Sequence, residues 1–488
     1  MKGKLKRVMA LVLAAVMVLS MAACGDKDKE NNVGGKNDTN NPGNEDTKDP
    51  NDTKDPDKEG DITSWIIQDD HDTLTGTVRF WIPFKGTQGM DDMIADFNKV
   101  YPNVKVELNT YSNNTDGNVS VDAAIMSEQV DVLASFGLSN AHSRWANGLY
   151  QDLTPYIEQY NIDMVANWGS DVYKYDDTYY TFPCGGLSYY IAINETAWVE
   201  AGMSLDDLPT DEWTWDEYLA ACEKMTKGEG DSKVYGGSDY HSLDYVMRPY
   251  GQVNGHDYFY ASNGKEASFT DPLVINALKR EIKAEQEDQI WFPLITYRSD
   301  SLQAQDTYMA GQTASSITCN MTRFIRDTEK YPDYDWVTYF APYPVEEKGQ
   351  ENYMSGVVNF SHAGIATGCQ DEKAAWAFLS WYSTYGVKYL VMAGHLPAWK
   401  GTDASGLVEL MFETEENAAK FIDVDSYNRV VANYDNPAYQ DTVTTAYSEV
   451  SSAFTEYMMY AHNGEMTVEK AMEEAKKIAD EAIADELK

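Results

Sequence analysis

The order strand, helix, strand in the first part of the globular chain most constrains what this protein can fold into. Residues 77–86, TVRFWIPFKG, are apolar at every second position and then break at a proline and a glycine. Residues 90–100 are apolar at helical spacing, 104–108 alternate again, and 129–137 form a short buried run. Strands joined through a helix run in the same direction, so the pattern predicts a parallel α/β lobe. Ligands of such sheets bind at the carboxyl ends of the strands, where we therefore expect the functional residues.

The first residues have the layout of a bacterial export signal. A basic start that includes Lys2 and Arg7 precedes a wholly apolar run over 8–19, and small residues lead to Cys24. The apolar run is shorter than the roughly 20 residues of a membrane-spanning helix. We expect a lipoprotein signal over 1–23 with lipidation of Cys24. The alternative is an ordinary secretory signal that has a cysteine nearby.

Residues 24–60 predict a lipidated, disordered tether. After Gly25 the only aliphatic side chain in this stretch is Val33, and the remainder is Asp, Lys, Asn, Gly, Thr, Pro and Glu. Such a composition cannot offset its ordering entropy by burial, and its prolines and mixed charges keep it extended. No later run is long and apolar enough to cross a bilayer. We therefore expect a globular part held at the extracellular face of the cytoplasmic membrane by the lipid on Cys24.

The charge balance argues against several classes of partner. The sequence has 79 acidic and 38 basic residues and a formal net charge of −41 at pH 7. A chain this acidic is repelled by nucleic acid and by anionic lipid. The sequence also has no cluster of Lys and Arg that could hold a polyanion. We expect no nucleic-acid partner.

Cysteines and histidines suggest neither a metal site nor a cofactor. Cys184, Cys222, Cys319 and Cys369 lie far apart without a C-x-x-C motif; they permit three pairings, and buried free thiols are favoured over bridges. The seven histidines are scattered, without H-E-x-x-H. The sequence has no Walker loop, no G-x-S-x-G elbow and no glycine-rich dinucleotide turn. We therefore expect no metal and no cofactor.

Later segments predict a crossing between lobes and several helices. Residues 177–194 are strand-like with a proline and a glycine pair in the middle, which suits a chain crossing between two lobes. Thr214 and Glu217 have the spacing of a capping box and predict a helix start. Residues 372–390 and 467–483 are strongly helical in pattern.

A series of short segments resembles one protein family by its order along the chain. The segments are VRFW at 78–81, MIADFNKVYPNVKVEL at 93–108, VDVLASFGLSNAHSRWANGLYQDLTPYI at 130–157, YDDTYYTFP at 175–183, TWDE at 214–217, YMAGQTASSI at 308–317, AAWAFLSW at 374–381 and HLP at 395–397. In this order they resemble the extracellular solute-binding proteins of the maltose-binding type, over about residues 74 to 485.

The resemblance implies an α/β, two-lobed periplasmic-binding-protein-like fold of type II, with crossing hinge strands and a helical C-terminus. It implies an N-lobe of residues 74–184 plus about 290–345, and a C-lobe of 185–289 plus about 346–485. It further implies that a carbohydrate, with an oligosaccharide favoured, is captured between the lobes and delivered to the membrane permease subunits of an ABC importer. Such a protein is a monomer and catalyses no reaction.

Candidate ligand residues are rings and polar groups at strand exits and crossings. Sugars offer apolar C–H faces that stack on rings, and hydroxyls that donate and accept hydrogen bonds. The candidates are Trp81, Phe84, Lys85, Ser135, Phe136, Ser139, Tyr189, His241, Asn320, Arg323 and Trp399. Trp81 could instead fill the lobe core, His241 could cap a helix, and Arg323 could form a salt bridge between lobes.

Two other classes of function remain open at this stage. A lipid-anchored glycoside hydrolase or lyase needs two carboxylates at a defined separation, and 79 acidic residues make chance pairs unavoidable. A peptide-binding or adhesin lipoprotein is the second alternative. Turnover of sugar would identify the first class, and an affinity that requires a protein partner would identify the second.

Overall fold

The computed structural model describes residues 65–84, 87–171, 173–239, 243–300, 302, 304–440, 442 and 445–488. The chain divides into two units, Met1–Gly60 and Asp61–Lys488, and all described residues belong to the second. The predicted signal, the tether and Cys24 therefore lie outside the described residues. Within the described part, no helix is both long and apolar enough to cross a membrane.

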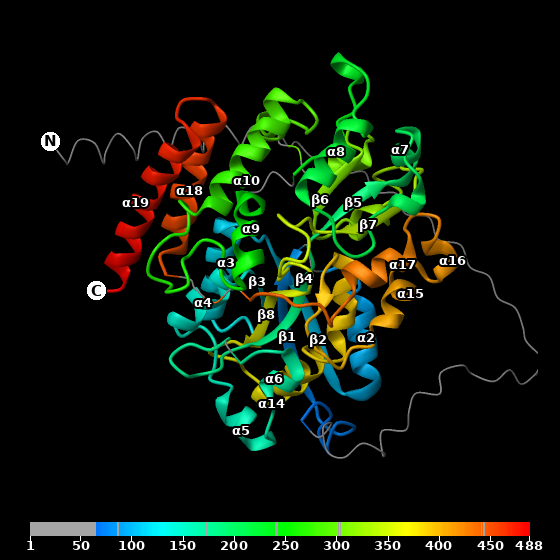
Figure 1. Cartoon of the computed structure of the whole chain (residues 1–488). Helices are drawn as coiled ribbons and strands as arrows, with labels where there is room; N and C mark the ends of the chain where they lie inside the picture. Colours follow the sequence, from blue (N-terminus) through cyan, green and yellow to red (C-terminus); the bar gives the residue numbers. More distant parts are fainter. Residues whose placement is uncertain are drawn as a thin grey trace, which may run out of the picture. The chain divides into compact units, whose positions relative to one another are not determined.

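Nine strands in the described residues form two sheets (Figure 1). The strands are β1 (Gly76–Pro83), β2 (Val104–Tyr111), β3 (Val132–Phe136), β4 (Phe182–Leu187), β5 (Tyr190–Asn194), β6 (Ser315–Thr318), β7 (Thr338–Pro342), β8 (Val358–Ile365) and β9 (Leu396–Pro397). The larger sheet has the order β2-β1-β3-β8-β4-β9, and the smaller has the order β6-β5-β7. Strand β1 pairs in parallel with β2 and β3, which confirms the predicted parallel α/β lobe.

The described helices flank these sheets. They are α2 (Met90–Val100), α3 (Thr115–Met126), α4 (Leu138–Ala146), α5 (Thr154–Tyr160), α6 (Met164–Trp168), α7 (Glu195–Glu200), α8 (Trp215–Met225), α9 (Leu243–Asn254), α10 (Pro272–Ile282), α11 (Leu294–Ser299), α12 (Ala304–Met309), α13 (Thr322–Ile325), α14 (Glu372–Tyr382), α15 (Leu407–Phe412), α16 (Glu415–Ala418), α17 (Val424–Ser426), α18 (Tyr447–His462) and α19 (Val468–Glu486). Two π-helices, η5 (Lys283–Glu287) and η8 (Tyr427–Val431), continue α10 and α17. The 3₁₀ helices are η3 (Leu205–Asp207), η4 (Gly230–Ser232), η6 (Gly386–Ala393) and η7 (Ala404–Gly406).

Apolar periodicity places the first helix and strands as expected. The buried face of β1 includes Phe80, whose ring centroid lies 4.9 Å from that of Phe378 on α14. Phe97 of α2 contacts the same ring edge to face at 5.2 Å. The capping box at Thr214 is present at the start of α8. The predicted helix over 372–390 is shorter than expected, because α14 ends at Tyr382 and η6 follows.

The chain crosses between the sheets where the sequence predicted a crossing. Strand β4 belongs to the larger sheet and β5 to the smaller, so the crossing lies at Ser188 and Tyr189. A Cβ atom at Gly186 would lie 2.3 Å from Val357 Cγ1 and 2.8 Å from the carbonyl oxygen of Val358. Only glycine permits this close approach of the two backbone segments beside the crossing.

Two segments of the chain pair with the other sheet than the predicted division into lobes required. Strands β6 and β7, within about 290–345, pair with β5 of the smaller sheet. Strand β8, in the segment assigned to the C-lobe, pairs with β3 and β4 of the larger sheet. The difference has a physical reason: β8 is buried between two strands that lie far away in the sequence, and a local pattern does not show such partners.

Each sheet has its own hydrophobic core. The cluster beneath the larger sheet joins β1, β3 and α14, and the cluster beside the smaller sheet joins β5, α8, α18 and α19. Helices α18 and α19 pack side by side, which gives the expected helical C-terminus (Figure 1). Cys184, Cys222 and Cys319 are buried thiols rather than disulfide bridges, as predicted, and Cys369 is a partly exposed thiol.

Candidate functional site

The carboxyl ends of β2 and β3 present a row of side-chain amides. Asn113, the second residue after β2, accepts hydrogen bonds from the side-chain amides of Asn118 and Asn140, each at 3.4 Å. Asn140 also donates to the carbonyl oxygen of Phe136, the last residue of β3, at 2.8 Å. Amides both donate and accept, as recognition of hydroxyls requires. The sequence analysis missed this row, although the polar run that begins at Ser112 directly after a strand was the available signal.

The buried side chain of Arg144 is hydrogen-bonded to this row of amides. Its Nη2 donates to Asn118 Oδ1 at 2.7 Å, and its Nε pairs with Asp122 at 2.6 Å. Its Nη1 donates to the hydroxyl of Ser135 at 2.7 Å, and that hydroxyl shares a hydrogen bond with Tyr150 at 2.7 Å. Ser135 lies within β3 and is fully buried, so the prediction of an exit-loop position for it is wrong. The hydroxyl of Ser135 is instead hydrogen-bonded to Arg144 and Tyr150.

Three rings meet at the junction of the two sheets. The ring centroid of Phe136 lies 4.7 Å from that of His395 and 5.7 Å from that of Phe360, and the last two lie 5.5 Å apart. Phe136 and His395 are buried, whereas Phe360 is partly exposed. Phe360 packs against the cores of both sheets. All three rings come from segments of the larger sheet, and the packing of Phe360 on both cores places this ring cluster at the boundary between the two sheets.

Asn320 and Arg323 adjoin the ring cluster. A Cβ atom at Gly394, next to His395, would lie 3.0 Å from Asn320 Cβ and 3.3 Å from Arg323 Cβ, and Gly394 has a φ of +81°. The side-chain oxygen of Asn320 is buried and accepts no hydrogen bond from the described residues. Burying an acceptor without a hydrogen-bond donor costs free energy of folding, and a water or a ligand that donates to it removes this cost.

Tyr189 contributes a ring from the crossing, and that ring is already stacked. The guanidinium of Arg248 lies 3.6 Å from its centroid. Arg248 is buried and also donates to the hydroxyl of Tyr439 at 2.7 Å. The Tyr189 ring is thereby held at the junction, with one face covered by a cation.

The other candidates are more scattered. The indole N–H of Trp81 donates to the carbonyl oxygen of Gln129, which precedes β3, so this ring reaches away from the carboxyl edge. Trp399 lies in the core beneath the larger sheet, and its N–H donates to Asn167 at 2.8 Å. Phe84 is 67% exposed after β1, and Ser139 is half-buried in the first turn of α4. Lys85 and His241 lie outside the described residues.

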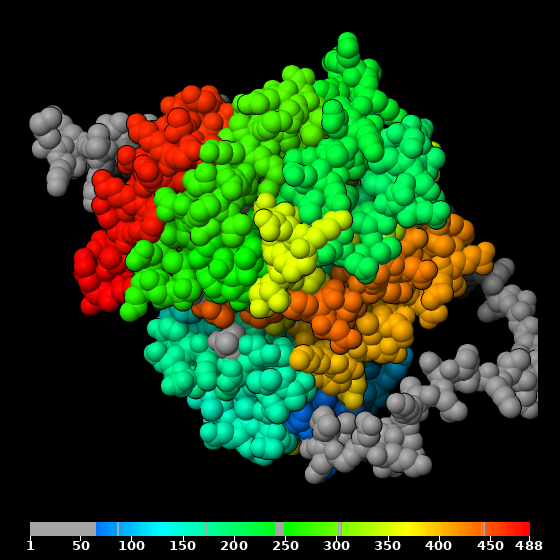
Figure 2. All heavy atoms as spheres, in the orientation of Figure 1, coloured from blue at the N-terminus to red at the C-terminus, as the bar shows by residue number. Residues whose placement is uncertain are grey.

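Gln440 joins two parts of the chain at this junction. Its side-chain oxygen accepts from the Tyr173 hydroxyl at 2.5 Å and from the Asn359 N–H at 2.8 Å. Its amide nitrogen donates to the carbonyl oxygen of Val357 at 3.1 Å. Nearby, Asn436 donates to the carbonyl oxygen of Ser355. On the face shown in Figure 2, yellow and orange segments of the chain lie across the boundary between the green and cyan parts.

His362 is the buried histidine of the larger sheet. It lies opposite Ser135 and Pro183 in the neighbouring strands, and its ring centroid is 4.9 Å from that of Tyr173. Burial lowers its pKa to about 3, so the imidazole is neutral at pH 7. Among the described side chains, no group of three or more His, Cys, Asp or Glu is placed to hold a metal ion.

Comparisons with known proteins give one family and one fold. The family model of bacterial extracellular solute-binding proteins matches residues 84–389. No curated protein matches the chain.

Three solved structures illustrate the shared fold. A sugar transporter from Rhizobium etli has 16% identity and a TM-score of 0.66, covering 83% of this chain and 98% of that one. An ABC substrate-binding protein from Listeria monocytogenes, in complex with cycloalternan, has 17% identity and a TM-score of 0.66, covering 84% and 100%. A maltose/maltodextrin-binding domain from Bdellovibrio bacteriovorus, bound to maltotriose, has 14% identity and a TM-score of 0.59, covering 84% and 100%. These likenesses confirm the predicted two-lobed α/β fold.

Proposed function

Because the chain belongs to the bacterial extracellular solute-binding proteins, we propose that it binds a carbohydrate between its two sheets and delivers it to the permease subunits of an ABC importer. The solved structures that it resembles include proteins bound to cycloalternan and to maltotriose. An oligosaccharide is the favoured cargo for this chain. The proposal includes no covalent step and no cofactor.

The observation that carries the proposal is the buried acceptor beside the ring cluster. Asn320 Oδ1 lacks a donor in the described structure, and it adjoins the segment Gly394–His395, which contacts Phe360 and Phe136. A sugar would donate a hydroxyl hydrogen to Asn320 and lay a C–H face on the partly exposed Phe360 ring. The amide row on the larger sheet would take further hydroxyls.

The division of these groups between two sheets suggests how binding would work. Phe136 and the amide row belong to the larger sheet, whereas Asn320 follows β6 of the smaller one. Neither set alone encloses a sugar, so the arrangement that brings both sets onto the ligand binds it best and becomes more populated. The permease would then recognise that arrangement.

The second part of the proposal is anchoring of the chain at the extracellular face of the membrane through lipid on Cys24. A binder without an anchor would diffuse away from its permease in a cell that lacks an outer membrane. Metabolic labelling with an alkyne fatty acid tests this point. Label on the wild-type protein and none on Cys24→Ala would support the anchor, and an unlabelled wild-type protein would contradict it.

The direct test of sugar binding is thermal unfolding of the purified protein with a panel of neutral mono- and oligosaccharides. A ligand of the folded state stabilises it by about 2.7 kcal/mol at a hundredfold excess over Kd. We expect one clear upward shift of Tm, with the sugar recovered intact. Recovered fragments would indicate a glycoside hydrolase or lyase, and no shift with any sugar would contradict the proposal.

A further inference from the structure

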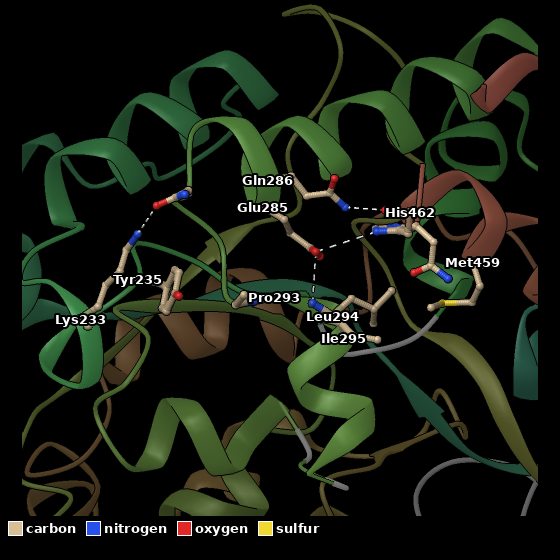
Figure 3. A pocket seen from close by; sticks show the side chains of 12 residues that line it. Lys233, Tyr235, Glu285, Gln286, Pro293, Leu294, Ile295, Met459 and His462 are labelled. Carbon is tan, nitrogen blue, oxygen red and sulfur yellow. Dashed lines mark hydrogen bonds and ion pairs between the residues drawn. The ribbon is translucent and has the colours of Figure 1, made fainter. Parts of the chain in front are cut away.

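A separate hollow lies beside the smaller sheet's helices, and none of the predicted ligand residues that the structure describes lines it (Figure 3). Its volume is about 590 Å³, and it is bordered by the π-helix η5, the start of α11 and the last turn of α18. Short π-helices often occur at functional sites because they change which side chains a helix presents. The hollow is large enough for a small organic molecule.

The two sides of this hollow differ in chemistry. Glu285 and Gln286 extend from η5 toward His462 on one side, while Leu294 and Ile295 lie opposite (Figure 3). The Gln286 side-chain nitrogen donates to the carbonyl oxygen of His462 at 2.7 Å, which turns its own oxygen away from that contact. Ile295 is 59% exposed, an unusual state for a large aliphatic side chain at the rim of a cavity. One side therefore accepts hydrogen bonds and the other offers apolar surface.

On the acceptor side Glu285 and His462 are buried, whereas Gln286 is exposed. Glu281 and Glu285 both face His462, with Glu281 Oε1 3.6 Å from Nε2 and Glu285 Oε2 3.9 Å from Nδ1. Glu285 Oε2 also accepts the backbone N–H of Leu294 at 3.1 Å. The His462 side chain is only 4% exposed, and its Nε2 makes no hydrogen bond within the described residues. The Glu285 carboxyl is thus fixed by the backbone of Leu294, while His462 Nε2 has no hydrogen-bond partner within the described residues.

Burial favours the uncharged forms of the titratable groups at this wall. Burial raises the pKa of Glu285 to about 8 and that of Glu281 well above its usual value, while burial lowers the pKa of His462 to about 4. Asp239 raises the pKa of Glu281 further, and Arg298 lowers the pKa of both Glu281 and His462.

Two more cations lie near the wall: one is paired with a carboxylate, and the other, which lines the hollow, is hydrogen-bonded to a neutral amide. Arg280 forms an ion pair with Glu346 at 2.9 Å, and Lys233 donates to Gln289 at 3.3 Å. Glu285 and His462 thus line the hollow, Glu281 lies beside His462 outside the lining, and these three groups are largely uncharged at pH 7. A cation inside the hollow would make the ionised form of Glu285 favourable again.

We propose that this hollow binds a small organic ammonium ion with an apolar body. The N–H groups of the ligand donate to the side-chain oxygens of Glu285 and Gln286, and its apolar body lies on Leu294, Ile295 and Met459. At pH 7 the Glu285 carboxyl carries a proton in the empty hollow. Binding of the ammonium ion forms a carboxylate–ammonium pair and releases that proton to solvent. This site is independent of the proposed carbohydrate site.

Calorimetric titration with isoamylammonium chloride tests the proposal. We expect one saturable site and an observed enthalpy that differs between phosphate and MOPS buffers at pH 7, because a proton is released. Glu285→Gln should weaken binding at least tenfold, while Glu287→Gln, an exposed neighbour on the same turn, should not. Isoamyl alcohol, the neutral analogue, should bind at least tenfold more weakly than the ammonium ion.

Three results would overturn the proposal: no saturable binding of isoamylammonium, equal binding by Glu285→Gln, or equal binding of the alcohol. If Glu285→Gln does not fold by circular dichroism, Ile295→Ser replaces it, because that exposed side chain contributes little to the core. Ile295→Ser should weaken binding severalfold, and unchanged binding would contradict the site.

Discussion

At the scale of single residues, buried hydrogen bonds separate structural side chains from those available to a ligand. Ser135 was predicted to lie in the loop that leaves the third strand, because that stretch is small and polar. Its hydroxyl is instead used by Arg144 and Tyr150. The sequence could not show this, because Arg144 reaches back from a helix to a strand. Asn320 is the opposite case, since its buried oxygen has no donor in the described structure.

Ser135→Ala should therefore lower stability rather than ligand affinity. The change leaves Arg144 Nη1 and the Tyr150 hydroxyl without their shared partner inside the protein, which costs about 1–3 kcal/mol. Urea unfolding measures this loss. Ser139→Ala, at a half-buried position on α4, is the matched control and should change the free energy of unfolding by much less. Equal losses in both variants would show that the buried network contributes nothing.

His362 gives the protein a stability that depends on pH. Its pKa is lowered to about 3 by burial, whereas an unfolded histidine titrates near 6.5. A lowered pKa on a base means that its contribution is complete above pH 6.5 and is lost as pH falls from 6.5 toward 3. Unfolding measured between pH 7.5 and 4 should show a smaller loss of stability in His362→Gln than in the wild type. Parallel pH profiles for the two proteins would contradict this role.

At the scale of elements, local periodicity explains what could be predicted. The strand at β1, the helix α2 and the strand β2 follow one another within a short stretch, and each has a clear apolar pattern. The assignment of the returning strands failed because periodicity carries no information on pairing partners. Strand β8 lies between β3 and β4, which precede it by well over a hundred residues. The same limit hid the ring cluster, whose members come from β3, β8 and the segment before β9.

The crossing element depends on the absence of a side chain at Gly186. A Cβ there would lie 2.3 Å from Val357 Cγ1 and 2.8 Å from a backbone oxygen, so Gly186→Ala should lower the free energy of unfolding by about 1–3 kcal/mol. Thermal and urea unfolding both report this. Gly406→Ala is the matched control, because a Cβ at Gly406 meets no atom within 4 Å. An unchanged free energy of unfolding in Gly186→Ala would mean that the two strands beside the crossing can move apart at little cost.

At the scale of the whole molecule, each sheet has its own core, and the two sheets are joined by a shared apolar cluster that includes Tyr190 and Leu396 and by specific side-chain contacts. Phe360 packs on both cores, and Gln440 links Tyr173 with the start of β8. A sugar bound at this junction would add contacts to both lobes at once. The proposed site therefore lies at the junction. Most aromatic residues fill the cores instead, and the sequence alone could not distinguish them from residues that contact a ligand.

The measurement that tests this account most directly is calorimetric titration of Asn320→Ala with the saccharide that stabilises the wild type. Removing a buried acceptor that lacks a donor should leave stability unchanged or slightly higher, while the lost hydrogen bond weakens binding by about 1–3 kcal/mol. Asn147→Ala, at an exposed helix end, should bind like the wild type. Unchanged affinity in Asn320→Ala, with normal folding, would contradict a carbohydrate site at the junction of the two sheets.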